Sequence, residues 1–376
     1  MKTILFLCNH AAFFVSHRLP IAIESKKYFN VKLIIGRPSS KSMELNAINK
    51  LKKHKIKYQR LKYKSFTYNL FLDIYGFLQI FFHIFKNKPK LIHLISPKCI
   101  IFGGIVCKIL NVKSVVISIS GLGSIMNIES NLIKKIYFNL LKFVFSNKNK
   151  KIIFHNNYDL LLFKKMFKLK KKDLLITYGS GVNFIEKKNK SHEKKIVIFP
   201  SRVLKDKGII EFIEASKILK KKYSDWKFIV VGSIDYDSPM KYKIKNTDDF
   251  YKSVKFIGHK NNIKKYLNEA SIVCLPSYRE GMPKVLLEAS ALGKPIVTTN
   301  IPGCKDIVEL CKNGILVKPK NSKSLYEGLE KLINNKNLRK KMKFNSYKNS
   351  RKYFDVNKVV DIHLKCYEQL FSNVRQ

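Results

Sequence analysis

Two glutamates eight residues apart, Glu280 and Glu288, follow a short apolar run that ends near residue 275. The run predicts a strand, and Pro283 predicts a helix that begins there, because proline is tolerated in a first helical turn. Glu280 and Gly281 would then lie in the loop at the strand's carboxyl end, with Glu288 about one turn into the helix. An ionised carboxylate only accepts hydrogen bonds, so each glutamate is suited to binding hydroxyl groups.

The start of that helix is also a candidate anion site. Backbone N–H groups at a helix N-terminus point at bound phosphates, and the segment concerned is Gly281, Met282, Pro283, Lys284 and Val285. A purely structural interpretation competes, because acidic residues favour helix starts through the helix dipole. On these residues alone the two interpretations stand about level.

Two cations flank another predicted turn. Arg202 and Lys207 lie between an apolar run that ends at Phe199 and a predicted helix over Ile209–Lys221. Arginine supplies a planar fork and lysine a point charge, and the two together can neutralise a leaving diphosphate. In this lysine-rich chain Lys207 alone carries little weight, whereas arginine is scarce and Arg202 stands out.

The elements that must position these side chains alternate regularly. Short apolar runs, typical of strands buried on both faces, are separated by longer helical stretches, which predicts βαβ units and parallel sheets. We predict an α/β architecture of two doubly wound, Rossmann-like lobes facing a cleft, with the carboxyl ends of the strands lining it. The predicted strands are Thr3–Leu7, Val31–Ile35, Leu91–Ile95, Ser114–Ile119, Lys151–Phe154, Lys195–Phe199, Phe228–Val231, Val254–Ile257, Ile272–Leu275 and Ile296–Thr298.

A polar stretch separates the two series of strands. Residues 186–194 predict a linker between an N-terminal lobe over 1–185 and a C-terminal lobe over 195–354. Residues 355–376 predict a helix that can pack back on the N-terminal lobe.

Taken together, these motifs resemble the retaining glycosyltransferases of family 4, which have the GT-B fold. The E-x7-E motif of the family corresponds to Glu280 and Glu288, and its Arg-x4-Lys pair corresponds to Arg202 and Lys207. The resemblance covers roughly residues 196–328, and its further landmarks are Val230-Val231-Gly232, Phe256-Ile257-Gly258-His259 and Gly293-Lys294-Pro295-Ile296-Val297, followed by Gly303.

The resemblance implies a transferase that moves a hexosamine-type sugar from a UDP-sugar with retention of anomeric configuration. Arg202 and Lys207 would hold the donor diphosphate and stabilise the charge that develops on it. Glu280 would bind the donor sugar and complete this catalytic set, and Glu288 would bind the ribose. No cofactor and no metal are expected, since the cations and helix amides supply the charge. The remaining donor contacts would be Gly281, Met282, Pro283, Lys284, Val285, Gly258 and His259.

The first lobe resembles a subgroup that extends undecaprenyl-diphosphate-linked sugars for surface polysaccharide such as capsule and O-antigen, or for protein glycosylation. The motifs concerned are His17-Arg18-Leu19-Pro20, Ser96-Pro97-Lys98 and Gly121-Leu122-Gly123-Ser124. The resemblance implies that this lobe binds the acceptor, with Arg18, Lys98 and His17 as candidate contacts. The family's glycine-rich loop after the first strand is absent, and its first-lobe histidine has no secure counterpart, although His93 precedes one motif. A structural role is the competing interpretation of His10, His17 and His155.

Two segments are unusually apolar. Residues 131–146 place an apolar face beside a stripe of lysine and asparagine, the pattern of a helix lying in a bilayer interface. For this segment a membrane contact and a cover for the sheet are equally good interpretations. For residues 66–86 a cover for the sheet is favoured, because a predicted strand follows directly. No apolar stretch reaches 18 residues, so we predict no spanning helix.

The overall charge is +48, from 74 Lys and Arg against 26 Asp and Glu. We attribute about half of this excess to the bias of an AT-rich genome and the rest to a real anionic surface or ligand. The seven cysteines lack CxxC spacing, and several lie in apolar runs, which predicts reduced core residues. We expect a cytoplasmic protein, peripheral at the inner face of the cytoplasmic membrane, with no cleaved signal peptide at its apolar N-terminus.

Three other functions compete. A GT-B-fold nucleotide-sugar epimerase would need acid and base residues at the sugar, and no distinctive set is found. A nucleic-acid binder would pair basic stripes with aromatic platforms, and no such motif is present. An inactive scaffold is disfavoured by the intact quartet of Glu280, Glu288, Arg202 and Lys207. The donor sugar, the acceptor, the linkage and the oligomeric state are not specified by the sequence.

Overall fold

The chain folds into two compact α/β units. The computed structural model describes residues 1–37, 41–64, 70–121, 130–184, 194–234, 240–242 and 252–372. Unit 1 comprises residues 1–180 together with 356–376, and unit 2 comprises residues 181–355. The chain therefore passes between the units twice, and the predicted linker, 186–194, falls outside the described residues except for Lys194.

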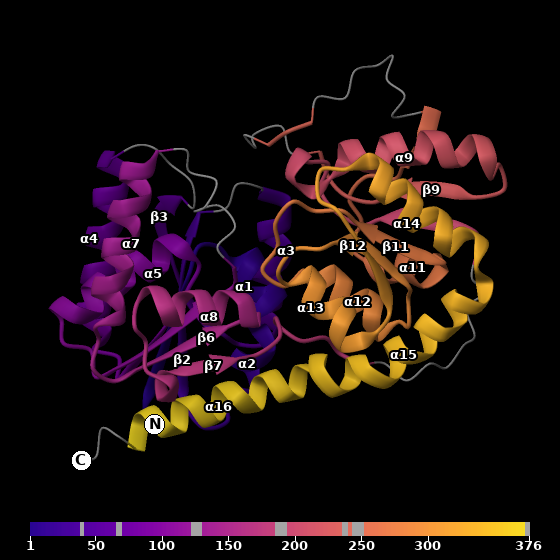
Figure 1. The fold of residues 1–376 in the computed structure, drawn as a ribbon. Coiled ribbons are helices and arrows are strands. Elements are labelled where there is room, and N and C mark those ends of the chain that lie inside the picture. Colours follow the sequence, from indigo (N-terminus) through magenta and orange to yellow (C-terminus); the bar gives the residue numbers. More distant parts are fainter. Residues whose placement is uncertain are drawn as a thin grey trace. The chain divides into compact units, whose positions relative to one another are not determined.

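Unit 1 is built on a seven-stranded parallel sheet with the order β3-β2-β1-β4-β5-β6-β7 (Figure 1). The order reverses at β1, which pairs with both β2 and β4, as in a doubly wound fold. Its strands are β1 Thr3–Cys8, β2 Asn30–Arg37, β3 Lys57–Lys64, β4 Leu91–Ile95, β5 Ser114–Ile119, β6 Lys150–Phe154 and β7 Leu174–Ile176.

Helices cover both faces of this sheet. One face packs against α1 Ala11–His17, α2 Leu19–Ser25, α3 Lys41–Lys53 and α16 Val356–Ser372. The other packs against α4 Leu70–Asn87, α5 Pro97–Ile109, α7 Asn131–Phe145 and α8 Asn157–Met166. A 3-10 turn, η1 Lys171–Asp173, precedes β7. Successive residues of β1 alternate between the two cores, because side chains point to opposite faces along a strand.

Unit 2 has a six-stranded parallel sheet with the order β10-β9-β8-β11-β12-β13. The strands are β8 Ile196–Phe199, β9 Lys227–Val230, β10 Lys255–Phe256, β11 Ile272–Leu275, β12 Ile296–Thr299 and β13 Gly314–Val317. The helices are α9 Ile209–Lys222, α11 Ile263–Glu269, α12 Lys284–Ala291, α13 Cys304–Cys311, α14 Ser322–Asn334 and α15 Lys336–Phe354, with a 3-10 turn, η2, at Lys205–Lys207. Helices α9 and α14 share one face of the sheet, and α12, α13 and α15 lie on the other (Figure 1).

The two doubly wound lobes are confirmed. All ten predicted strands are present, within a residue or two of their predicted ends. Three strands were missed, namely β3, β7 and β13, and each lies at or near a sheet edge. In β3, charged residues alternate with buried Leu61 and Tyr63. The strand is therefore not a continuous apolar run and was not predicted.

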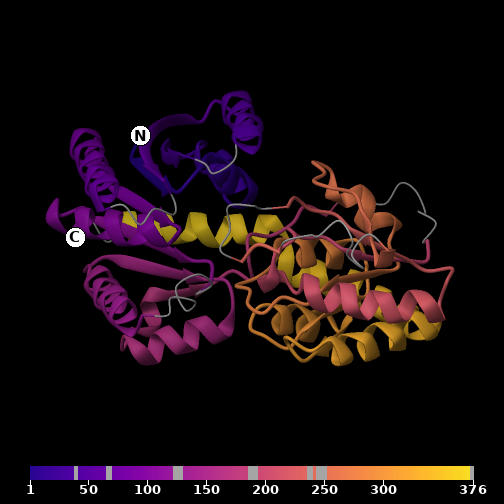
Figure 2. The same ribbon diagram turned by 90° about the horizontal axis from the view of Figure 1, so that it is seen from above.

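The C-terminal helix α16 belongs to unit 1, although the residues before it belong to unit 2. It packs against α2 and buries Val359, Val360 and Tyr367 in the first core. Figure 2 shows this helix, in yellow, alongside the elements of the first lobe. All seven cysteines are free and buried, as predicted.

The helix predicted over residues 66–86 corresponds to α4, of which the structure describes Leu70–Asn87, and it carries two apolar stripes. Within α4, Ile80 and Ile84 are buried against the sheet, whereas Phe71, Leu78 and Phe82 are exposed. One apolar stripe of α4 therefore covers the sheet, as predicted, and a second stripe faces outward. In α7, the outward apolar residues are Leu132, Ile133, Ile136 and Phe143. Among the described residues, no helix is both long enough and apolar enough to cross a membrane.

Candidate functional site

The loops that follow β8 and β11 meet at the carboxyl ends of two neighbouring strands. The Tyr278 N–H donates a hydrogen bond to the Asp206 carbonyl over 2.8 Å. The Tyr278 hydroxyl donates to Glu211 Oε1 over 2.7 Å, and Glu211 itself is buried in the first turn of α9. The turn that carries Arg202 and Lys207 is thereby tied to the segment that carries Glu280.

Lys207 and Glu280, 73 residues apart in sequence, form a direct ion pair. Lys207 Nζ lies 2.6 Å from Glu280 Oε1, and the Ser277 hydroxyl donates to the same oxygen over 2.9 Å. Burial alone would lower the pKa of the Lys207 ammonium, but the adjacent Glu280 carboxylate raises it above its usual value. Arg202 is exposed, and its positive charge acts on Lys207 in the opposite sense.

Two glycines let the backbone close around this pair. A Cβ on Gly208 would lie 2.1 Å from the Pro276 carbonyl oxygen, and one on Gly303 would lie 2.0 Å from the Gly281 carbonyl oxygen. Both glycines also have positive φ, 76° and 78°, in the region that side chains disfavour. Replacing either would push apart the loops that hold Glu280.

The helix after this loop begins one residue later than predicted. Pro283 is the N-cap, with extended backbone angles, and α12 starts at Lys284. The Pro283 carbonyl accepts from the Leu286 and Leu287 amides, so Lys284 and Val285 form the first turn. Met282 is buried just before it.

Glu288 lies in α12 and is half-buried. Burial raises the pKa of its carboxyl above the usual 4.5, and the positive charges of Lys284 and Lys264 offset part of that rise. Lys264 comes from α11 and was not singled out in the sequence. A buried carboxylate with raised pKa is suited to accepting hydroxyl hydrogen bonds that replace its lost hydration.

Gly258 and His259 follow β10. Gly258 has φ of 76°, and its carbonyl accepts from the Gly232 amide over 3.1 Å. His259 is exposed. Their predicted contact with a nucleotide base stays a prediction.

The candidate residues of unit 1 lie in different surroundings. The Arg18 guanidinium is fully buried and bonds to the His17 carbonyl and to His155 Nε2, each over 3.0 Å. This placement does not fit the predicted role of Arg18 as an acceptor contact, since no face of the guanidinium reaches solvent. Lys98 pairs with Asp73 at 2.7 Å.

The other histidines named in the sequence hydrogen-bond to neighbouring groups of unit 1. His17 Nδ1 lies 3.1 Å from the Ser180 hydroxyl, and its acceptor role stays a prediction. His10 caps α1 by accepting from the Phe13 amide. His93 is buried between the Tyr367 hydroxyl and the Ser118 hydroxyl, 2.7 Å from each. Of the first-lobe glycine motif, only Gly121 is described, and the remainder lies outside the described residues.

Two family descriptions match this chain. Residues 3–156 match "Glycosyl transferase 4-like", and residues 182–349 match "Glycosyl transferases group 1". Together the two matches cover most of both units. The chain is therefore a glycosyltransferase with a 4-like domain followed by a group 1 domain.

Two relatives of this glycosyltransferase, one with a named activity and one uncharacterized, show the extent of the similarity. A Campylobacter jejuni N,N'-diacetylbacillosaminyl-diphospho-undecaprenol alpha-1,3-N-acetylgalactosaminyltransferase is 28% identical over 327 residues, 81% of this chain and 84% of the relative. An uncharacterized glycosyltransferase of Haemophilus influenzae is 38% identical over 147 residues, which is 39% of this chain and 41% of that protein.

The fold of the glycosyltransferase has close structural counterparts. The crystal structure of Anabaena HepE in complex with UDP and glucose superposes with a TM-score of 0.76 at 17% identity, covering 98% of this chain and all of that one. The expected GT-B architecture of two parallel-sheet lobes is therefore confirmed.

The described part of the glycosyltransferase holds no cluster of three or more His, Cys, Asp or Glu side chains that could bind a metal ion.

Around the Lys207–Glu280 pair, the sequence had not assigned roles to Ser277, Tyr278 or Glu211. Ser277 and Tyr278 closely precede the glutamate motif, but a partner as distant as Glu211 becomes visible only once the loops are brought together.

Proposed function

We propose that this glycosyltransferase transfers a hexosamine-type sugar from a UDP-sugar to a lipid-linked sugar acceptor in the synthesis of a surface glycan. The observation that carries the proposal is the junction of the β8 and β11 loops, where Lys207 and Glu280 form an ion pair in the turn that also carries Arg202. The Anabaena neighbour binds UDP, and the Campylobacter relative uses an undecaprenyl-diphosphate acceptor whose sugar is N-acetylated.

The proposed roles follow from charge and position. Arg202 and Lys207 bind the donor diphosphate and stabilise the negative charge that grows on it as the glycosidic bond breaks. Glu280 accepts hydrogen bonds from donor sugar hydroxyls, and Lys207 keeps its carboxylate in place at 2.6 Å. Glu288 accepts hydrogen bonds from the ribose. The amides of the first turn of α12 add a partial positive charge beside the phosphates.

We also propose that the transfer retains the anomeric configuration and needs no metal ion. Two cations and a helix N-terminus supply the charge that a divalent ion would otherwise bring. The stereochemistry is tested by the anomeric proton coupling of the product made from an α-linked UDP-sugar, and a β-linked product would contradict retention. The metal claim is tested by transfer in excess EDTA.

The unit 1 lobe is proposed to take the acceptor at an anionic membrane surface. The exposed apolar residues of α7 are bordered by exposed Lys135 and Lys142, and those of α4 are bordered by Lys86. Apolar residues with flanking lysines suit a helix that lies at the level of anionic headgroups. We propose that this contact holds the protein at the inner face of the cytoplasmic membrane.

A thermal-shift screen against UDP, GDP, ADP and their common sugar conjugates, with EDTA present, tests the donor assignment. A ligand that binds only the folded protein at ~100 times its Kd adds about 2.7 kcal/mol to the free energy of unfolding. A selective shift with UDP or a UDP-N-acetylhexosamine is expected, and it should shrink in Arg202→Ala. No shift with any nucleotide would refute the proposed donor site.

A further inference from the structure

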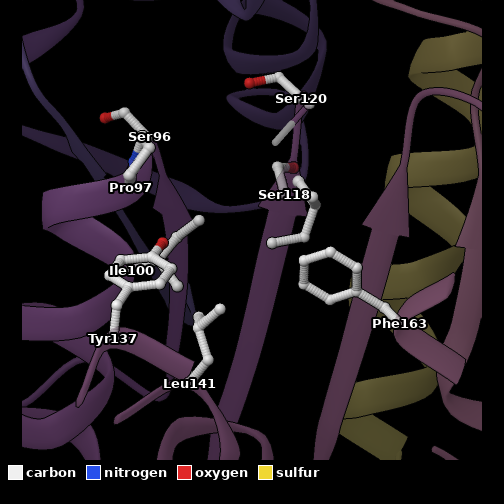
Figure 3. A pocket seen from close by; sticks show the side chains of 10 residues that line it. Ser96, Pro97, Ile100, Ser118, Ser120, Tyr137, Leu141 and Phe163 are labelled. Atoms are coloured by element: carbon white, nitrogen blue, oxygen red, sulfur yellow. The ribbon is translucent and has the colours of Figure 1, made fainter. Parts of the chain in front are cut away.

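A small hollow in unit 1 lies at the carboxyl ends of β4 and β5, outside the site described above. Figure 3 shows Ser96, Tyr137 and Phe163 among the side chains around it. It has room for about one water molecule, so it cannot take a substituent of a sugar. The unassigned groups nearest to the proposed chemistry lie instead in unit 2, beside Glu280.

Tyr278 lies two residues before Glu280 and is tied to the neighbouring loop at two points. Its backbone N–H donates a hydrogen bond to the Asp206 carbonyl over 2.8 Å, and its hydroxyl donates to Glu211 Oε1 over 2.7 Å. Glu211 stands in the first turn of α9, four residues after Lys207. The two bonds therefore join the segment that carries Glu280 to the segment that carries Lys207.

The carboxylate of Glu211 depends on this tyrosine. Glu211 is 6% exposed. Within the described ranges of the chain, its Oε1 accepts from Tyr278 and its Oε2 has no hydrogen-bond partner. A buried carboxylate costs much free energy unless it is hydrogen-bonded, so the Tyr278 hydroxyl is held firmly on α9.

The ring and the proton of Tyr278 are also fixed. Lys320, from the loop between β13 and α14, places its ammonium 5.2 Å from the ring centroid. Burial raises the pKa of the Tyr278 hydroxyl, and the hydrogen bond to Glu211 raises it further. The hydroxyl consequently keeps its proton at neutral pH and acts as the donor in this bond.

The Lys207–Glu280 ion pair leaves a freedom that this bond removes. Lysine and glutamate side chains each have several rotatable bonds, and fixing them costs conformational entropy. The 2.6 Å contact between Lys207 Nζ and Glu280 Oε1 is best maintained when the two backbones that carry them are held at a fixed separation. The bond between Tyr278 and Glu211 supplies that constraint without using any group to which the proposed function assigns a donor contact.

We propose that Tyr278 and Glu211 are positioning residues of the transferase. Their hydrogen bond sets the separation of the β8 and β11 loops and so holds the Glu280 carboxylate where the donor sugar binds. The inference rests on the donor site proposed above. UDP carries no sugar for Glu280 to bind, so loss of the bond should lower turnover while the affinity for UDP is preserved.

Tyr278→Phe removes the hydroxyl and keeps the ring. The probes are UDP-N-acetylglucosamine and UDP-N-acetylgalactosamine as donors, with a synthetic lipid diphosphate of N-acetylglucosamine as acceptor. We expect kcat to fall by at least ~10-fold, since a displacement of about 1 Å in a site can cost about 10²-fold. The Kd of UDP, measured by calorimetric titration, should stay unchanged.

Tyr326→Phe is the matched control. The Tyr326 hydroxyl also donates to a glutamate of unit 2, Glu330, over 2.6 Å, and both residues lie in α14. This variant loses the same kind of bond away from the two site loops, so its kcat should equal that of the wild-type protein.

A double variant, Tyr278→Phe with Glu211→Met, separates positioning from stability. Both partners are then apolar, so no bare carboxylate is buried and the free energy of unfolding should recover toward the wild-type value. Turnover should nevertheless stay at least ~10-fold below wild type. Recovery of turnover together with stability would show that the bond acts only through the stability of the fold, and the positioning role would be wrong.

Single variants of Glu211 cover the case in which the double variant does not fold. Glu211→Gln retains an acceptor for the Tyr278 hydroxyl and should keep near wild-type turnover. Glu211→Met removes the acceptor and should be as slow as Tyr278→Phe. Equal turnover in Glu211→Gln and Glu211→Met would contradict the positioning role.

Unchanged kcat in folded Tyr278→Phe would overturn this inference alone, since transfer by the wild-type protein leaves the proposed function intact. Failure of the wild-type protein to transfer from either donor would overturn the proposed function, and this inference with it.

Discussion

Glu280 accepts hydrogen bonds from two donors at once, Lys207 Nζ and the Ser277 hydroxyl, and both reach the same carboxylate oxygen. Neither of these two hydrogen bonds involves its second oxygen, which is the one that we propose for the donor sugar. A carboxylate held in this way costs little reorganisation when it binds hydroxyls, which is how preorganised polar groups accelerate a reaction.

Glu280→Gln keeps the shape of the side chain and removes its charge. We expect turnover to fall by at least ~100-fold, the scale of losing one oriented polar group. Steady-state transfer at saturating UDP-sugar, below the unfolding temperature of the variant, measures this. Glu309→Gln, at an exposed glutamate of α13 paired with Lys305, is the control and should leave turnover unchanged. Near-normal turnover in Glu280→Gln would remove Glu280 from the catalytic set.

Glu288, the proposed ribose ligand, also affects stability. Burial raises the pKa of its carboxyl above 4.5, so the folded protein binds this proton more tightly than the unfolded chain does. The buried charge therefore destabilises the fold above the folded-state pKa, and this cost disappears as pH falls through that pKa toward the unfolded value.

Glu288→Gln removes the buried charge. The variant should be more stable than wild type at pH 7, and the difference should vanish near pH 4, where both side chains are neutral. Its affinity for UDP should nevertheless fall, because an amide accepts fewer hydrogen bonds from the ribose than a carboxylate does. Denaturant unfolding across this pH range, together with UDP titration, provides both readouts. Equal UDP affinity would exclude the ribose role.

At the scale of elements, α4, α5 and α7 form one layer of the first lobe, with α5 in contact with both of the others. Gly104 of α5 lies against Val144 of α7, so closely that a Cβ would be 2.4 Å from Val144 Cγ1. Val144 is fully buried and Leu140 is half-buried. Of the outward apolar residues of α7, Phe143 has the Lys108 ammonium 4.3 Å from its ring centroid, so Leu132, Ile133 and Ile136 near the start of the helix are the ones left to contact a membrane.

Replacing Leu132, Ile133 and Ile136 by Ser should release the folded protein from anionic liposomes. Each Å² of apolar surface that the membrane no longer buries removes about 25 cal/mol of binding free energy. Flotation with phosphatidylglycerol vesicles measures this. A matched triple variant removes exposed apolar residues elsewhere, namely Leu45, Ile218 and Phe344, and should stay bound.

The α4 stripe needs a separate variant, Phe71→Ser, Leu78→Ser and Phe82→Ser. Release by this variant together with retention of the α7 variant would assign the membrane contact to α4. If both remain on the vesicles, neither helix is the anchor.

At the scale of the whole molecule, residues from both ends of the chain share one buried network in unit 1. His363 of α16 stacks on His93 of β4 with ring centroids 5.6 Å apart, and Arg18 reaches His155 of the loop after β6. Burial lowers the pKa of all three histidines, and the Arg18 charge lowers them further; the pKa of His363 falls to about 3.

These shifts predict acid sensitivity. A histidine with a depressed folded-state pKa stays neutral in the fold while the unfolded chain takes up its proton near pH 6.5, so stability is lost as pH falls below 6.5. Each such histidine contributes a slope of about 1.4 kcal/mol per pH unit. The slope should extend down to the folded pKa, which for His363 is about 3.

His363→Gln should reduce the pH slope of the unfolding free energy by up to about 1.4 kcal/mol per pH unit. Denaturant titrations between pH 5 and 6.5 measure this slope. His54→Gln, outside the network at the end of α3, is the control and should leave the slope unchanged. An identical slope in wild type and His363→Gln would show that protonation of His363 is not linked to unfolding.

Much of this molecule was predictable from local patterns. Continuous apolar runs identified the inner strands, since a strand buried on both faces has no need for polar residues. The motif around Glu280, the Arg202–Lys207 turn and the family resemblance followed from residues close in sequence. The edge strand β3 was missed because charged residues alternate with its apolar ones.

Only the tertiary structure decided which distant residues meet. The 2.6 Å contact of Lys207 with Glu280 and the hydrogen bond of Tyr278 to Glu211 depend on β8 and β11 being neighbours, an order that their own sequences do not encode. Arg18 looked like a phosphate ligand by residue type, yet packing encloses it among histidines from β4, from the loop after β6 and from α16. Residue type and spacing determine what a side chain can do chemically; strand order and packing decide whether it reaches a substrate or the core.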